Sequence, residues 1–193
     1  NRKTKKYQSK LGNAEKIQRR LVLNEDPKSP ISEAFRSLRT SLMYSNSNTN
    51  DDSNVIIVSS PGPGEGKTTN IVNLAITYAN LGKKTIVIDG DLRKPVIHKV
   101  FNIPKSSGIT SYLSNVESDY KKIINDTEIE NLSVITSGIV PPNPSEILAS
   151  NNMKTLINEL KNKYEIILID SPPLLAVTDT FVCMEYANQF VLV

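Results

Sequence analysis

The sequence predicts an α/β fold, a mostly parallel sheet with helices on both faces. Three apolar runs, at residues 55–58, 85–88 and 166–169, are typical of strands that are buried on both faces. Segments with helical character separate these runs, and such alternation of strand and helix is typical of a parallel sheet. The chain has 193 residues, which is enough for one domain of this kind but not comfortably for two.

The first helix is predicted to begin at Ser29-Pro30, because Ser is a good N-cap and Pro fits the first helical position. An apolar stripe follows at helical spacing, and three charged residues fall on a different side of the same helix. The stripe consists of Ile31, Phe35, Leu38 and Leu42, and the charged residues are Glu33, Arg36 and Arg39. Residues 46–54 are rich in Ser, Asn and Asp and are predicted to form a loop.

From Val55 onward the sequence predicts a regular alternation of elements. The expected strands are 55–59, 85–89, 132–136, 165–170 and 189–193. The expected helices are 69–81, a short one near 95–101, a helical stretch over 109–125, helices within 144–162, and 178–187. Gly82 is well placed to end the first of these helices with a left-handed cap.

Residues 61–69, Pro-Gly-Pro-Gly-Glu-Gly-Lys-Thr-Thr, follow the first strand directly and have the pattern of a phosphate-binding loop. The three glycines lack a Cβ, so the backbone can adopt positive φ and turn its N–H groups around a polyphosphate. They are Gly62, Gly64 and Gly66. Lys67 is expected to reach the β- and γ-phosphates, and Thr68 to offer its hydroxyl to Mg²⁺.

The context of this loop supports the same interpretation. The helix that follows would point its positive N-terminal end at the bound anion. The full pattern has Gly where this chain has Pro61, but the Gly-Lys-Thr core and the strand–loop–helix order remain. A glycine-rich surface loop is the alternative. The sequence therefore predicts a P-loop NTPase-like domain that binds a nucleoside triphosphate.

Two further predicted strands end in carboxylates. Asp89 and Asp91 are two residues apart at the end of the second strand, so both side chains are expected on one edge of the pocket. Such close carboxylates repel, and Mg²⁺ accompanying a triphosphate is the natural cation between them. Asp170 ends another strand, before two prolines, and fits the further carboxylate that supports Mg²⁺ in phosphate-loop enzymes. Taken singly, each Asp can also be a turn residue or a helix cap.

Composition excludes several classes of site. The chain is 38% hydrophobic and 22% charged, as in ordinary soluble domains. The single Cys183 excludes an internal disulfide, and together with the single His98 it argues against a zinc site or a Cys–His nucleophilic pair. No run approaches the roughly 20 apolar residues that cross a bilayer, and the sequence has no signal-peptide pattern.

Positive charge is concentrated at the beginning of the chain. Residues 1–20 carry eight basic side chains and one acidic one, whereas the other 173 residues carry 15 basic and 19 acidic ones. A basic lead-in over residues 1–28 is predicted to be flexible and solvated, or to lie beside an anionic membrane surface. Basic and aromatic residues do not alternate along this segment as they do in surfaces that stack on bases, so nucleic-acid binding is not expected. The sequence starts without Met and stops within an expected strand, so a fragment is expected.

Taken together, these motifs resemble the bacterial tyrosine kinases (BY-kinases) of capsule and exopolysaccharide operons, over about residues 25–193. The resemblance includes the phosphate loop, Val-Ile-Asp-Gly-Asp-Leu-Arg-Lys-Pro over 87–95 and Ile-Leu-Ile-Asp-Ser-Pro-Pro over 167–173. It also includes residues 138–148, which contain Pro-Pro-Asn-Pro-Ser-Glu, and the Glu33-x-x-Arg36-x-x-Arg39 helix. The resemblance implies a P-loop kinase domain over 29–193, truncated at its C-terminus.

The resemblance also implies roles for residues. Asp89 would orient or deprotonate the attacking tyrosine hydroxyl, with Lys67 and Asp91 as further catalytic residues. Mg²⁺ would be held by Thr68, Asp91 and Asp170. Contacts to ATP would come from Gly62, Gly64, Glu65, Gly66, Lys67, Thr68 and Thr69. Glu33, Arg36 and Arg39 would dock on a neighbouring subunit; the alternative for these three is a solvated helix face with charge pairs.

The activity implied is an ATP-dependent protein-tyrosine autokinase that acts in trans within a ring-like homo-oligomer and regulates capsular or exopolysaccharide synthesis and export. The implied partners are a membrane activator of the polysaccharide co-polymerase type, separate or fused, and a cognate tyrosine phosphatase. The implied location is cytoplasmic, at the inner face of the membrane. The family ordinarily ends in a tyrosine-rich tail; here the seven tyrosines are scattered along the chain.

Two other functions share part of this pattern. ATPase switches of the MinD and ParA type have the same nucleotide motifs. They normally carry a lysine where this chain has Gly62, and they lack the Glu-x-x-Arg-x-x-Arg helix. A non-catalytic scaffold that binds ATP within a polysaccharide export complex is the second alternative. Substitution of Asp89 by Asn discriminates the kinase from the scaffold, because it should spare ATP binding and abolish transfer.

Overall fold

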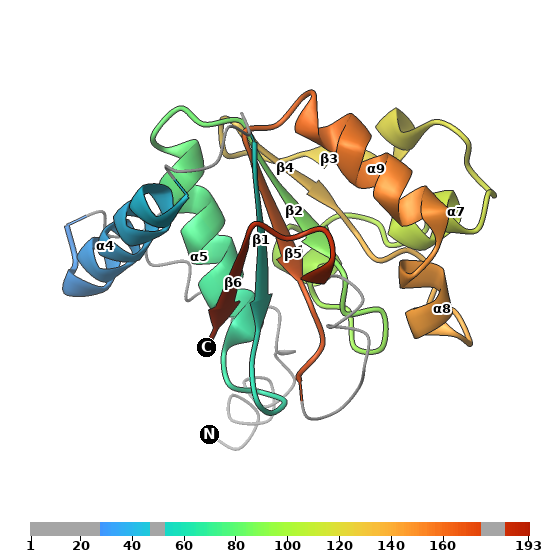
Figure 1. The fold of residues 1–193 in the computed structure, drawn as a ribbon, viewed down its shortest axis with the longest axis horizontal. Coiled ribbons are helices and arrows are strands. Elements are labelled where there is room, and N and C mark those ends of the chain that lie inside the picture. The colour runs from blue at the N-terminus through green and yellow to red at the C-terminus, as the bar shows by residue number, and fades with distance from the viewer. Residues whose placement is uncertain (1–27, 47–52, 175–183) are drawn as a thin grey trace, which may run out of the picture.

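A six-stranded sheet with helices on both faces forms the centre of the computed structural model, which describes residues 28–46, 53–174 and 184–193 (Figure 1). The strands are β1 (Asn54–Ser59), β2 (Thr85–Asp89), β3 (Ile124–Asp126), β4 (Leu132–Ile135), β5 (Ile166–Asp170) and β6 (Gln189–Leu192). Their order in the sheet is β3-β4-β2-β5-β1-β6. All neighbouring pairs are parallel except β3 and β4, which are antiparallel. The prediction of a mostly parallel α/β sheet is confirmed.

Alternate residues of the central strands face two separate core layers. In β1, Ile56 and Val58 belong to one layer, whereas Val55 and Ile57 belong to the other. The same alternation holds in β5, where Leu168 lies in the first layer. Since successive side chains of a strand point to opposite faces, continuous apolar runs are what a sheet covered on both faces requires.

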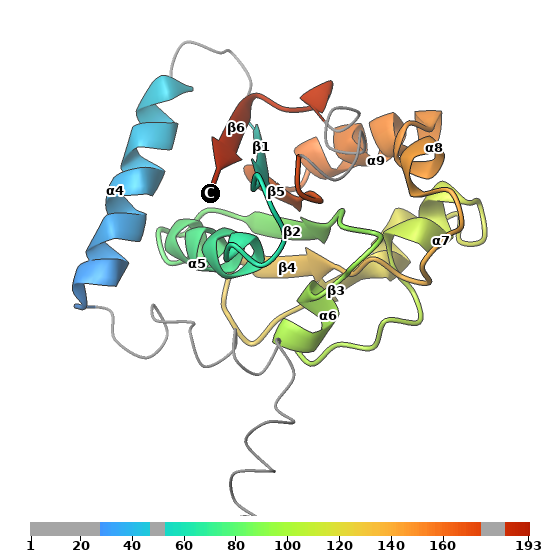
Figure 2. The ribbon, with the colours of Figure 1, turned by 90° about the horizontal axis from the view of Figure 1, so that it is seen from below.

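Helices cover both layers (Figure 2). One face is covered by α5 (Lys67–Ala79), with α4 (Pro30–Ser45) packed outside it, and by α6 (Ile97–Val100). The other face carries α7 (Ile109–Leu113), α8 (Pro144–Leu148) and α9 (Asn151–Lys161), with the 3-10 turn η1 (Tyr120–Ile123) leading into β3. Within these described ranges, no helix is long and apolar enough to cross a membrane.

The beginning of α4 follows its sequence signals. The Ser29 hydroxyl accepts a hydrogen bond from the backbone N–H of Ser32 at 3.1 Å, and Pro30 is the first helical residue. Three residues of the predicted apolar stripe pack against the first core layer, namely Phe35, Leu38 and Leu42. Ile31, the fourth, is 52% exposed, so the stripe was predicted one turn too long.

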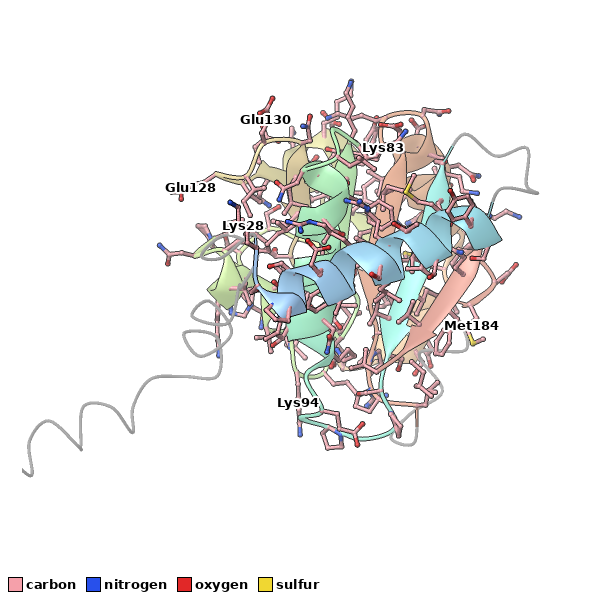
Figure 3. The ribbon with its side chains drawn as sticks, turned by 90° about the vertical axis from the view of Figure 1, so that its left-hand side faces the viewer. Lys28, Lys83, Lys94, Glu128, Glu130 and Met184 are labelled. Carbon is pink, nitrogen blue, oxygen red and sulfur yellow. The ribbon has the colours of Figure 1, made fainter. Side chains whose placement is uncertain are left out.

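Helix α5 lies two residues earlier at each end than the predicted 69–81. It begins at Lys67, two residues before the predicted start, and ends at Ala79. Gly82 has a φ of 83°, and Lys83 donates its N–H to the Tyr78 carbonyl at 3.2 Å, as in a left-handed helix cap. Figure 3 shows Lys83, just after this cap, and Lys94, which follows β2, at opposite ends of the molecule.

The predicted helical stretch over 109–125 is wrong in its length. Helix α7 ends at Leu113, and Asn115 has a φ of 58°, which a continuing helix does not allow. The chain then forms η1 and the antiparallel strand β3, which was not predicted. The predicted helix over 178–187 and Cys183 lie largely outside the described residues, as does most of the basic lead-in.

A close backbone contact joins the start of α7 to the end of β4, and it predicts a large effect of a small substitution. A Cβ on Gly108 would lie 2.3 Å from the Gly138 nitrogen and 2.3 Å from the Thr136 carbonyl oxygen. Gly108→Ala must therefore shift backbone, and we expect it to lower the free energy of unfolding by about 1–3 kcal/mol. Urea unfolding measures this change.

Ser107→Ala is the matched control, because Ser107 is exposed and contributes only its backbone carbonyl to the Thr136 hydroxyl. We expect Ser107→Ala to change stability by less than about 0.5 kcal/mol. Equal unfolding curves for the two variants would contradict the close contact.

Candidate active site

The carboxyl ends of three neighbouring strands form the site. Strand β1 leads into the phosphate loop, β2 ends in Asp89, and β5 ends in Asp170. Asp89 and Asp170 are direct partners in the register of β2 and β5. Helix α5 begins at this edge of the sheet (Figure 1). Open parallel sheets bind ligands at this edge, because successive βα loops converge there.

The phosphate loop turns directly into α5. Gly64 and Gly66 have φ values of 83° and 92°, and Gly66 is the N-cap of the helix. Gly62 does not take a positive φ; instead its N–H donates to a Glu65 carboxylate oxygen at 2.9 Å. The predicted positive φ is therefore confirmed for Gly64 and Gly66 and wrong for Gly62. A Cβ on Gly62 would lie 3.3 Å from Oε1 of Glu65. The positive end of α5 faces the loop, which favours an anion there.

Lys67 lies buried between two carboxylates. Its Nζ forms an ion pair with Oδ1 of Asp170 and lies 3.6 Å from Oδ2 of Asp91. Burial by itself lowers the pKa of Lys67, but the attraction of Asp170 and then of Asp91 outweighs it and raises that pKa. Lys67 is therefore a fixed positive charge at the mouth of the phosphate loop.

Asp170 joins Lys67 and the first turn of α5. Its Oδ2 accepts a hydrogen bond from the Thr68 hydroxyl at 2.9 Å. Burial raises the pKa of the Asp170 carboxyl, and the neighbouring Lys67 and Thr68 offset only part of that effect. Just beyond it, the Ser171 hydroxyl donates to the Val58 carbonyl at 3.1 Å, which ties the ends of β5 and β1 together.

Asp89 is fully buried and holds the segment that follows it. Its Oδ2 accepts hydrogen bonds from the backbone N–H groups of Val96 at 3.2 Å and Ile97 at 3.0 Å. Its Oδ1 is buried without a hydrogen-bond partner among the residues that the structure describes. Burial raises the pKa of Asp89 well above its ordinary value, and Asp170 raises it further. The sequence carried no signal for the contact with Val96 and Ile97, which depends on how the chain turns after β2.

Asp91 is separated from Asp89 by a glycine that permits a close contact. The Gly90 N–H donates to the Asp170 carbonyl at 2.8 Å, and a Cβ on Gly90 would lie 2.9 Å from that oxygen. The Asp91 carboxylate accepts a hydrogen bond from the Lys94 N–H at 3.0 Å and is 8% exposed. Gly90 was not among the predicted site residues, although its place between two aspartates was an available signal. The structure brings Lys67, Thr68, Asp89, Asp91 and Asp170 together.

These residues fit a magnesium ion that arrives with a nucleotide. The Thr68 hydroxyl and the carboxylates of Asp91 and Asp170 are oxygens of the kind that Mg²⁺ prefers. No group of three or more His, Cys, Asp or Glu in the described ranges is arranged to hold a metal by itself. Mg²⁺ usually takes one or two carboxylates together with water and substrate phosphates, so a closed protein site is not required.

The predicted docking residues lie on α4, away from this site. The Arg36 guanidinium pairs with Glu33 within the helix. Arg39 donates to the Thr77 carbonyl of α5 at 2.7 Å, and its Nε is buried without a partner among the described residues. The prediction that all three lie apart from the packed side of α4 is therefore wrong for Arg39. The guanidinium of Arg39 thus joins α4 to the neighbouring helix α5.

The phosphate loop, the buried lysine and the strand-end carboxylates define a nucleotide-binding protein of the P-loop class. A family model described as an AAA domain matches residues 53–193. The chain belongs to the bacterial tyrosine-protein kinase family, because relatives that are 42% and 38% identical over 90% and 92% of this chain are named tyrosine-protein kinases. It is thus a tyrosine-protein kinase.

Two relatives and one solved structure carry this assignment. The putative tyrosine-protein kinase CapB of Staphylococcus aureus is 42% identical over 173 residues, covering 90% of this chain and 75% of CapB. Tyrosine-protein kinase YwqD of Bacillus subtilis is 38% identical over 178 residues, covering 92% of this chain and 74% of YwqD. The kinase domain of the Escherichia coli tyrosine kinase ETK matches with a TM-score of 0.84 at 32% identity, covering 90% of this chain and 67% of that one.

Proposed function

We propose that this chain is the ATP-binding and phosphotransfer part of a tyrosine autokinase that phosphorylates in trans within an oligomer and regulates capsular or exopolysaccharide synthesis and export. The observation that carries the proposal is the buried group of Lys67, Asp170 and Asp91 beside the phosphate loop. The phosphate loop and the family to which the chain belongs support nucleotide binding. The strand-end carboxylates support Mg²⁺ as the cation that binds with the nucleotide.

Each part of the site has a task in this proposal. The backbone of residues 62–66 and the start of α5 bind the phosphates, and Lys67 turns from Asp170 toward the β- and γ-phosphate oxygens. Thr68, Asp91 and Asp170 would hold Mg²⁺, which neutralises charge on the phosphates when it is bound. Glu65 shapes the loop through Gly62, and Thr69 lies in the first turn of α5. Positioning and charge neutralisation are the main requirements of phosphoryl transfer.

Asp89 is the proposed base. The tyrosine hydroxyl oxygen forms a bond to the γ-phosphorus, the bond from that phosphorus to the β-phosphate oxygen breaks, and ADP leaves. Asp89 Oδ1 takes the hydroxyl proton, since Oδ2 is occupied by the Val96 and Ile97 amides. Because Asp89 is fully buried, its surroundings must open to admit the acceptor tyrosine. Its raised pKa favours accepting a proton.

Self-association and the partners follow from the family resemblance. We propose that Glu33 and Arg36, which face outward on α4, contact a neighbouring copy, and that Arg39 orients α4 against α5. The proposed partners are a membrane activator and a cognate tyrosine phosphatase, and the proposed location is the inner face of the cell membrane. The basic residues at 1–28 would lie nearest that membrane.

The test is phosphotyrosine formation by the full-length protein with Mg²⁺-ATP and the cytoplasmic segment of its membrane activator. We expect phosphate on tyrosine, with a rate per molecule that rises with enzyme concentration, as transfer in trans requires. ADP release without phosphotyrosine would instead support the ATPase switch. The absence of both products would support the non-catalytic scaffold.

A further inference from the structure

Tyrosine side chains differ strongly in exposure, which matters in an enzyme that modifies tyrosine. Tyr44 is 76% exposed, whereas Tyr78 and Tyr164 are 0% and 5% exposed. Burial raises the pKa of Tyr78 to about 12. The other tyrosines in the described ranges are half-buried and pack against the second core layer: Tyr112, Tyr120 and Tyr186. Within those ranges, Tyr44 therefore presents the most accessible phenol ring.

Tyr44 lies far from the site of its own chain. It is in the last turn of α4, where the Leu42 carbonyl accepts a hydrogen bond from Gln189 Nε2 at 2.7 Å. Gln189 begins β6 and accepts a hydrogen bond from Asn54, the first residue of β1, at 2.6 Å. The phosphate loop follows the opposite end of β1, and a strand of six residues spans about 20 Å. Figure 1 shows that α5 begins at that opposite end.

Tyr44 lies one residue before the end of α4, in the turn from which a helix frays. Helix α4 ends at Ser45, whose hydroxyl also accepts a hydrogen bond from Gln189 Nε2. The Asn46 N–H closes this turn by donating to the Leu42 carbonyl at 3.2 Å. Opening this terminal turn breaks only local contacts, chiefly those with Gln189, whereas exposure of a core residue such as Tyr78 requires global unfolding. An extended Tyr44 can then enter a crevice at the edge of another sheet.

We propose that Tyr44 is a phosphorylation site that a second copy of this chain modifies in trans. This inference rests on the proposed autokinase function. The Tyr44 hydroxyl oxygen forms a bond to the γ-phosphorus of ATP on the second copy, and the bond to the β-phosphate oxygen breaks. ADP leaves, and the Asp89 carboxylate of the second copy takes the phenol proton. The phosphate loop of the chain that carries Tyr44 cannot reach this residue, because the length of β1 separates them.

Phosphate on Tyr44 also has a structural consequence. The last turn of α4 contains no basic residue, so a dianion on Tyr44 is not neutralised within that turn and is repelled by the negative end of the helix dipole. This repulsion weakens the hydrogen bond by which Gln189 holds the Leu42 carbonyl. Phosphorylation therefore loosens the end of α4, the helix that carries Glu33, Arg36 and Arg39.

The experiment mixes an active copy with an inactive acceptor copy. The full-length Asp89→Asn protein carries a mass label and serves as the acceptor, and the unlabelled wild type, with Mg²⁺-ATP and the activator segment, serves as the kinase. Peptide mass spectrometry measures phosphate on each tyrosine of the labelled copy. We expect Tyr44 to carry at least about tenfold more phosphate than Tyr78 or Tyr164, since they become accessible only on unfolding. Tyr44→Phe should remove this phosphate, and Tyr120→Phe should leave it unchanged.

Each outcome decides the inference. Phosphate on Tyr44 of the labelled copy supports it, together with about two- to fivefold faster hydrogen exchange at the end of α4 after phosphorylation. Phosphotyrosine elsewhere, with none at Tyr44, overturns the inference and leaves the proposed function standing. Phosphate at Tyr44 of the active copy alone, at a rate independent of concentration, overturns the argument for transfer in trans. Absence of phosphotyrosine anywhere overturns the proposed function and this inference with it.

Discussion

Lys67→Met is expected to reduce phosphotyrosine formation by about a hundred- to a thousandfold, the range observed when one preorganised donor to developing charge is removed. Methionine keeps most of the length of the side chain and lacks only the ammonium group. The β- and γ-phosphates then lose the one buried cation that the described part of the site offers at the phosphate loop. Quantitative phosphotyrosine detection on the full-length protein with Mg²⁺-ATP measures the loss.

The same substitution should make stability depend more steeply on pH. Without Lys67, the buried Asp170 loses its ion pair, so its pKa, already raised above 3.8, rises further. When folding raises the pKa of a carboxyl group, the protonated group stabilises the folded state at pH values below its pKa in the unfolded state. This stabilisation is lost as pH rises through the pKa in the folded state. The stability difference between Lys67→Met and wild type should therefore be small near pH 4 and grow toward neutral pH, where it approaches about 3 kcal/mol.

Lys83→Met is the matched control, because Lys83 pairs with Glu165 at the surface, at the other end of α5 (Figure 3). Both side chains of that pair are about two-fifths exposed, and such pairs contribute about 1 kcal/mol or less. We expect its activity and its pH profile to match the wild type. If Lys67→Met kept full activity, or lost equal stability at every pH, the role of the buried ion pair would be contradicted.

The fold was largely predictable because local patterns and global packing agree. The apolar runs of β1, β2 and β5 can be buried only between two helical layers, and the left-handed φ of Gly82 forms the cap that follows the end of α5 at Ala79. The region after α7 was not predictable in the same way. Its residues have weak helical periodicity, and the positive φ of Asn115 and the pairing of β3 with β4 depend on contacts distant in sequence.

Site residues could be predicted where a local motif determines their position. They could not be predicted where contacts between segments distant in sequence determine the position. The sequence placed Lys67 in the phosphate loop after β1 and Asp170 at the end of β5, and the parallel pairing of β1 with β5 brought them together. It gave no indication that Asp89 accepts hydrogen bonds from Val96 and Ile97, or that Gly90 touches the Asp170 carbonyl. It also gave no indication that Arg39, predicted to dock on a neighbouring subunit, donates a hydrogen bond to the Thr77 carbonyl within its own chain.

Asp89→Asn is expected to lower phosphotyrosine formation by about a hundred- to ten-thousandfold, the usual contribution of a positioned general base. An asparagine oxygen can still accept hydrogen bonds from the Val96 and Ile97 N–H groups, so the segment after β2 should stay in place. ATP affinity should remain within about threefold of wild type, a change below 1 kcal/mol. A fluorescent nucleotide titration beside the phosphotyrosine measurement separates these two effects.

Asp89→Asn should also stabilise the fold at neutral pH, which distinguishes it from most substitutions of buried residues. The wild-type carboxyl has a pKa raised well above 3.8 by burial and by Asp170, so ionised Asp89 destabilises the folded state as pH rises. Asparagine is neutral at every pH. The gain should therefore be largest near pH 7 or above and vanish toward pH 4, where the wild-type carboxyl is protonated. Urea unfolding across this range measures it.

The control for Asp89→Asn is the same chemical change at the opposite edge of the sheet. Asp126 is exposed at the end of β3 and accepts a hydrogen bond from the Ser133 hydroxyl at 3.1 Å. Asp126→Asn should keep kinase activity and show no comparable gain in stability. If Asp89→Asn transferred phosphate at the wild-type rate, Asp89 would not be the base. If it lost ATP binding instead, the carboxylate would serve the nucleotide rather than the acceptor tyrosine.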